Sequence, residues 1–152
     1  MGGSWRKAVK TVDALKGIKM RIGGLGGAVL TPLGVVPQQI AAGDIYPALE
    51  KGTIDAAEWI GPYDDEKLGF YKVAKHYYGP GWWESSTAFH FYVNKKEWDK
   101  LPKEYQAAFN AAAAEVNVTM MAEYDYKNPI ALAKLLQNGV KLHSFSKEIM
   151  EA

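Results

Sequence analysis

The segment GDIYPALEKGTIDAAEWIG at residues 43–61 decides the fold class of this 152-residue chain. Its first glycine and aspartate are suited to cap a helix over 45–51. Gly52 is suited to end that helix, because glycine readily adopts the left-handed conformation that follows many helices. Residues 54–60 then form a mostly apolar run of strand type. A helix and a strand joined by so short a connection indicate an α/β fold.

The rest of the chain continues this alternation. Residues 18–22 alternate apolar and polar side chains with the period of a strand. Pro129 is expected to kink or break a long helix, since proline lacks the backbone N–H that a helix interior needs. We expect further strands at 35–40, 82–93 and 140–145, helices at 12–16, 28–33, 64–74, 94–101 and 103–128, a helical pattern from there to Gln137, and a last helix that begins at Ser146.

Composition excludes several classes of protein. Hydrophobic residues make up 48% and charged residues 23%, as in a globular domain. The 18 basic and 17 acidic residues give 18 − 17 = +1, which does not favour a nucleic-acid partner. The absence of cysteine excludes disulfides, thiolate metal sites and cysteine nucleophiles. No apolar run is long enough for membrane insertion, and the first residues lack the apolar core of a signal peptide.

Several motifs that suggest catalysis or metal binding do not withstand inspection. The glycines at 23–27 lie between a strand and a helix, but the third position of a dinucleotide-binding motif falls on Val29. The histidines at 76, 90 and 143 lack metal-ligand spacing, and the acidic residues at 64–66 are explained by the start of a helix. We find no poised general base or nucleophile, so the chain is not expected to be an enzyme.

A candidate binding site lies where strands end. Arg21 ends the strand at 18–22, and ligands of open α/β sheets bind at such carboxyl ends. Glu58 and Trp59 end the strand at 54–60, and Glu84 follows two tryptophans. An arginine can grip a carboxylate, and two acids with backbone carbonyls can hold a hard cation. Alternatively, Arg21 faces solvent, or one of the acids simply pairs with it in an empty crevice.

The sequence resembles a known family at these residues. It is similar to the extracytoplasmic solute receptors of TRAP transporters, of the dicarboxylate-receptor type, with the 2-oxo-acid (pyruvate) receptors as the nearest group. The stretches 12–21, 43–59, 61–65 and 77–84 carry the resemblance, which covers essentially the whole chain. Asp44 and Pro47 depart from the usual residues of the family, outside the expected site.

The resemblance implies a periplasmic-binding-protein-like α/β fold. Full receptors of this kind have two domains joined by hinge strands and a long helix that spans both. This chain is therefore expected to be one half, with a mixed sheet. Residues 1–152 form a single receptor fragment, in which 1–60 are an α/β unit of the second lobe, and 61–152 contain the hinge strands, the spanning helix at 103–128 and the terminal strand.

The resemblance also implies roles for the candidate residues. Arg21 would hold the carboxylate of a small 2-oxo or monocarboxylic acid. Glu58, Trp59 and Glu84 would bind a sodium ion that bridges to the substrate, and Trp59 would use its backbone carbonyl and also touch the substrate. No organic cofactor is implied. The partners of the parent family are the TRAP membrane subunits.

The chain has about half of the length expected for the family. Compared with full receptors of the family, this sequence is expected to lack most of the first domain, a ligand-contacting glutamine upstream of Met1 and the helices after Ala152. We therefore expect truncation to weaken or remove ligand binding. The parent family is periplasmic, whereas a chain without a leader stays cytoplasmic if it is expressed as written. The alternative function is an interaction protein that forms a homodimer, exchanging the long helix or terminal strands, because removal of a domain exposes apolar surface.

Overall fold

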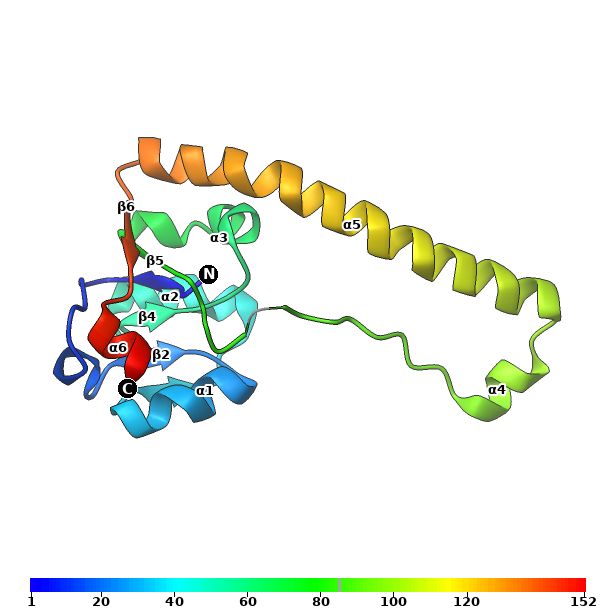
Figure 1. Ribbon diagram of the computed structural model, residues 1–152, viewed down its shortest axis with the longest axis horizontal. Helices are drawn as coiled ribbons and strands as arrows, with labels where there is room; N and C mark the ends of the chain where they lie inside the picture. Colours follow the sequence, from blue (N-terminus) through cyan, green and yellow to red (C-terminus); the bar gives the residue numbers. More distant parts are fainter. Residues whose placement is uncertain (85) are drawn as a thin grey trace. The chain divides into compact units, whose positions relative to one another are not determined.

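The computed structural model describes residues 1–84 and 86–152 (Figure 1). These residues form two compact units, which are described separately. The first comprises residues 1–84 and 128–152, and the second comprises 86–127. No helix in the described part of the chain has the length and apolarity needed to cross a membrane. The expected division of the chain near residue 60 stays a prediction.

The first unit is built on a mixed sheet, as expected (Figure 1). The strand order is β3-β2-β4-β1-β5-β6. β2 runs parallel to both β3 and β4, β1 runs antiparallel to β4 and β5, and β6 pairs in parallel with β5. The strands are β1 (Ser4–Trp5), β2 (Lys19–Arg21), β3 (Val36–Gln38), β4 (Ala56–Ala57), β5 (His76–Gly79) and β6 (Lys141–Ser144). The sequence pattern did not predict β1 or β5.

Short helices connect these strands or, in the case of α6, follow the last of them. They are η1 (Asp13–Leu15), α1 (Gly24–Leu30), η2 (Thr31–Leu33), α2 (Ala42–Lys51), α3 (Pro62–Leu68), η3 (Phe70–Lys72) and α6 (Lys147–Glu151). The helix expected over 64–74 is interrupted at Gly69, whose φ of 74° ends α3. Gly52 ends α2 in the same left-handed conformation, as predicted. Ser146 caps α6, since its side chain accepts the backbone N–H of Ile149.

The sheet separates two buried clusters of apolar side chains. One contains Trp5, Met20 and Ala56, and the other contains Ile45 and Ala57. Adjacent residues of β4 join different clusters because successive strand side chains point to opposite faces. A fully buried large apolar side chain stabilises the fold by about 1.5–3 kcal/mol, so these clusters hold β2 and β4 firmly in place.

Gly3 allows β1 to pass close to the end of β4. Its φ is 90°, which disfavours any residue with a side chain. A Cβ atom at this position would lie 2.6 Å from the carbonyl oxygen of Ala57. The residue after Ala57 is Glu58, so this glycine sets the backbone beside the candidate site.

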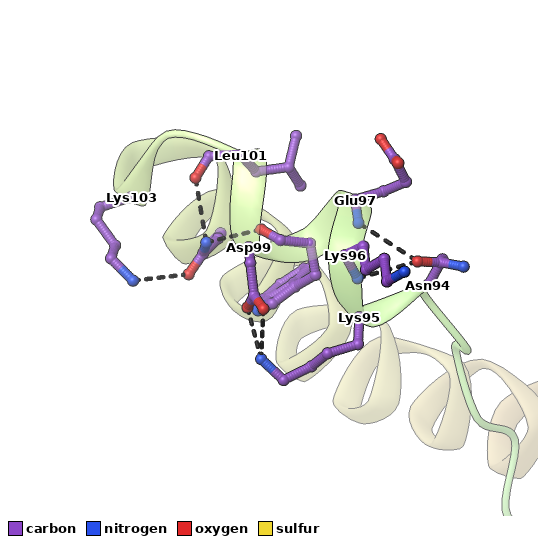
Figure 2. A network of polar contacts seen from close by, with 9 residues as sticks. Asn94, Lys95, Lys96, Glu97, Asp99, Leu101 and Lys103 are labelled. Atoms are coloured by element: carbon purple, nitrogen blue, oxygen red, sulfur yellow. Dashed lines mark hydrogen bonds and ion pairs between the residues drawn. The ribbon is translucent and has the colours of Figure 1, made fainter.

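The second unit contains α4 (Lys95–Lys100) and the first part of α5 (Lys103–Gln137). Figure 2 shows that Asn94 caps α4, as predicted: its Oδ1 accepts the backbone N–H groups of Lys96 at 2.9 Å and Glu97 at 3.4 Å. The Gln106 side chain joins the two helices, because its Nε2 donates to the carbonyl oxygens of Trp98 and Leu101.

Two expectations about this region are wrong. The strand expected over 82–93 is not formed in residues 82–84 and 86–93, which have no partner strand to supply ladder hydrogen bonds within the described chain. Residue 85 of this expected strand lies outside the described residues. The long helix does not end at 128 but continues through Pro129 to Gln137. Proline in a helix costs about 3 kcal/mol, and burial of Ala131 and Leu135 after it offsets that cost.

Candidate functional site

The candidate site lies at the shared carboxyl end of β2 and β4. In this parallel pair Met20 is opposite Ala56, and Arg21 is opposite Ala57. The backbone N–H of Glu58 donates to the carbonyl oxygen of Arg21 at 2.9 Å. The pairing register therefore places Glu58 beside Arg21, although 36 residues separate them in the sequence.

The Arg21 guanidinium is oriented by backbone carbonyl groups. Its Nη1 donates to the Glu58 carbonyl oxygen at 2.6 Å, and its Nε donates to the Ile40 carbonyl oxygen at 3.4 Å. Its central carbon lies 4.7 Å from the ring centre of Trp59, in a cation–π contact. Because these contacts fix the planar group, it is prepared to receive a carboxylate.

The Glu58 side chain is enclosed but weakly paired. It is 12% exposed, and its Oε2 lies 3.8 Å from Arg21 Nη1. Burial raises the pKa of this carboxyl to about 7, and the charge of Arg21 only partly opposes that effect. The negative charges of Asp65 and Glu84 raise it further. A cation beside Glu58 would stabilise the ionised carboxylate.

Glu84 is exposed and lies in the turn after β5. Its backbone N–H donates to the carbonyl oxygen of Gly81 at 3.2 Å. Its negative charge contributes to the raised pKa of Glu58, although less than burial does. Across residues 1–84 and 86–152, His, Cys, Asp and Glu side chains form no group of three or more that could hold a metal ion. Backbone carbonyls would therefore have to complete a cation site.

Asp65 is a buried residue beside the site that was not predicted from the sequence. Asp65 had been explained as an acid at the start of a helix, but its side chain is buried at 3% exposure. It accepts hydrogen bonds from the Tyr77 hydroxyl at 2.7 Å and from the backbone N–H of Ile60 at 3.3 Å. Burial raises the pKa of Asp65 to about 6, and these two hydrogen bonds oppose the shift.

Two histidines that are far apart in the sequence, His76 and His143, lie side by side in the fold. Nδ1 of His76 and Nε2 of His143 are 2.9 Å apart across β5 and β6. Burial lowers the pKa of both. The pairing of parallel strands brings them together, which their spacing in the sequence could not reveal. They lie on the far side of β1 from the strands β2 and β4 that carry Arg21 and Glu58.

The raised pKa values of Glu58 and Asp65 predict that the fold loses stability as the pH rises. The folded state holds these protons to higher pH than the unfolded state, so their contribution is greatest below about pH 4 and declines up to about pH 7. His76 and His143, with lowered pKa values, act in the opposite sense near pH 6.5.

We expect Asp65→Asn to reduce the loss of folding stability between acidic and neutral pH by about 1–3 kcal/mol, because asparagine resembles the protonated acid. Urea unfolding at about pH 4.5 and pH 7.5 measures the effect. If the free energy of unfolding changes between the two pH values by the same amount in the variant as in the original chain, the prediction is wrong.

The mixed sheet and its helices form an α/β fold, and the oriented arginine lies at the shared carboxyl end of two parallel strands. The chain belongs to the DctP family of bacterial extracellular solute-binding proteins (family 7), whose model matches residues 1–152. The predicted family and fold class are thereby confirmed. The family consists of solute receptors and is not a class of enzymes.

Its relatives include proteins with named ligands. The chain is 54% identical over its full length to a monocarboxylate 2-oxoacid-binding periplasmic protein of Nostoc. It matches a TRAP solute-binding protein of Bordetella bronchiseptica with 60% identity and a TM-score of 0.92, over 99% of this chain and 45% of that one. That structure is described as a dimer with copurified calcium and picolinate.

A second solved relative comes from Colwellia psychrerythraea and was determined with bound calcium and pyruvate. It has 41% identity and a TM-score of 0.93, and the match covers 99% of this chain and 46% of that one. A protein of Pseudoalteromonas atlantica, at 40% identity, holds sodium and pyruvate. The chain spans less than half of the length of these relatives, and 42% of the Nostoc protein.

Proposed function

We propose that this chain binds a small 2-oxo or other monocarboxylic acid together with a hard cation, as part of a receptor for TRAP membrane subunits. The observation that carries the proposal is the convergence of Arg21, Glu58 and Trp59 at the ends of β2 and β4. The named ligands of the relatives support it: 2-oxo acids in Nostoc, and pyruvate with calcium or sodium in two solved structures.

Each residue has a distinct role in this proposal. The fork of N–H groups on Arg21 binds the carboxylate of the ligand through charge-assisted hydrogen bonds. The Trp59 ring keeps the guanidinium in place and covers the ligand. Glu58, Glu84 and the carbonyl oxygen of Trp59 supply the oxygen ligands that sodium or calcium prefers. The cation offsets the cost of an ionised, buried Glu58 and bridges to the ligand.

A tryptophan-emission titration tests this function, because Trp59 lies at the proposed site. Pyruvate is added to the 152-residue chain in calcium, in sodium, or in choline as a large cation that cannot enter an oxygen-lined site. We expect a saturable change that needs calcium or sodium, with a dissociation constant of roughly 1 mM for a partly open site. A flat response in all three salts would contradict the proposal.

A second proposal is that the chain forms a homodimer through the second unit. None of residues 86–127 is buried, although that unit contains many large apolar side chains. Among them, Phe89 is 71% exposed, Val118 is 65% exposed and Met121 is 60% exposed. Apolar surface of this kind favours association with a second copy. Light scattering that shows a monomer at every concentration would contradict the dimer and leave the ligand proposal intact.

A further inference from the structure

We infer that Asp65 and Tyr77 are positioning residues, which fix the segment 58–60 of the binding site through the backbone amide of Ile60. This inference rests on the proposed function for its consequence in binding. It rests on the structure alone for the contact itself.

The contact is a buried chain of two hydrogen bonds. The Tyr77 hydroxyl, from β5, donates to Oδ2 of Asp65, in α3, at 2.7 Å. Oδ1 of the same carboxyl accepts the backbone N–H of Ile60 at 3.3 Å. Tyr77 is 1% exposed and Asp65 is 3% exposed, so water does not compete for these bonds. The carboxyl thus joins three separate parts of the first unit.

The start of a helix does not explain this arrangement. An acid in the first turn interacts favourably with a helix while it remains in water. Asp65 instead is buried, which disfavours the charged form of its side chain. A buried carboxyl that accepts a hydrogen bond on each oxygen is expected where a particular backbone position must be held.

The segment 58–60 is therefore fixed at both ends. At one end, the Glu58 backbone exchanges hydrogen bonds with Arg21 on β2: its N–H donates to the Arg21 carbonyl, and its carbonyl accepts from Nη1. At the other end, Ile60 donates to Asp65. Trp59 lies between these two attachments. Its ring and carbonyl, which the proposed site uses, are then held without a direct contact to Asp65.

The chain offers a matched pair of variants for the test. Tyr77 and Tyr78 are neighbours on β5, each is 1% exposed, and each hydroxyl is hydrogen-bonded. The Tyr78 hydroxyl accepts the N–H of Val9 at 2.8 Å and donates to its carbonyl at 3.0 Å, away from Ile60. Tyr77→Phe and Tyr78→Phe both leave buried polar groups unpaired, so both lower the melting temperature.

Two measurements separate positioning from general destabilisation. The first is hydrogen exchange of the Ile60 amide, followed by NMR without any ligand. The second is the affinity for calcium alone, followed by tryptophan emission. We expect Tyr77→Phe to remove the protection of Ile60 and to weaken calcium binding by about 10-fold, as is typical when the support of a metal ligand is lost. We expect Tyr78→Phe to keep both the protection of the Ile60 amide and the calcium affinity.

Equal changes in the two variants, or unchanged Ile60 exchange in Tyr77→Phe, would overturn the inference. If the original chain does not bind calcium, the proposed function fails, and the exchange of Ile60 alone decides whether Asp65 positions it. If Tyr77→Phe does not fold, Asp65→Asn and Asp65→Ala replace it. Asparagine keeps an oxygen that accepts the backbone N–H of Ile60, so we expect it to preserve the protection of that amide. Alanine has no such oxygen and is expected to remove the protection. Equal protection in these two variants would also overturn the inference.

Discussion

Replacing Arg21 with alanine is expected to abolish saturable pyruvate binding by the chain. The Arg21 guanidinium lies over the Trp59 ring and beside Glu58 at the carboxyl ends of β2 and β4. A charge-assisted, two-bonded contact to a carboxylate contributes about 1.5–3 kcal/mol, so its loss weakens binding about 10- to 100-fold. From a dissociation constant of roughly 1 mM, this raises the constant to roughly 10–100 mM, so the variant does not saturate at millimolar pyruvate. Isothermal titration calorimetry measures the change.

Arg21→Lys is the matched control for this prediction. Lysine keeps the positive charge but lacks the planar fork and its contact with the Trp59 ring. We expect it to restore only a small part of the binding. If Arg21→Ala binds pyruvate as tightly as the original chain does, the ligand does not occupy this site.

Glu58→Gln is expected to have two opposite effects. Burial disfavours the ionised form of Glu58 and raises its pKa to about 7, so the neutral amide removes an unfavourable charge above that pH. We expect the free energy of unfolding at about pH 8 to rise by about 1 kcal/mol, a value reduced for partial exposure of the site. The same change removes a cation ligand, and calcium affinity falls by about 100-fold. Urea unfolding and a calcium titration measure the two effects.

Glu84→Gln provides the comparison for Glu58→Gln. Glu84 is exposed, so its replacement is expected to leave stability within about 0.5 kcal/mol of the original. It should weaken calcium binding less than Glu58→Gln does, because water screens an exposed carboxylate. A gain in stability without any loss of calcium affinity in Glu58→Gln would show that Glu58 is not a cation ligand.

Most of the fold is encoded in local patterns. The alternation at 18–22 and the helix and strand at 43–61 predicted β2, α2 and β4 in their observed order. β1 has only two residues, and the four residues of β5 (HYYG) do not alternate apolar and polar side chains, so no periodic pattern marks either strand. Pro129 misled the prediction of the long helix, because packing of Leu135 after it is a tertiary contact that local propensity does not include.

The candidate site could be predicted only in part from the sequence. The rule that ligands bind at the carboxyl ends of strands selected Arg21 and Glu58, and the pairing of β2 with β4 places them together. Asp65 could not be selected, since nothing in a run of acids shows which side chain is buried. Its partner Tyr77 lies on β5, which joins the site only through the sheet order.

A crystal structure of the chain grown with pyruvate and calcium tests the central claim most directly. We expect the pyruvate carboxylate within hydrogen-bonding distance of Arg21, about 2.7–3.2 Å, and calcium about 2.3–2.6 Å from a Glu58 oxygen. Pyruvate bound elsewhere, or Arg21 and Glu58 unchanged with no ligand between them at saturating concentration, would contradict it.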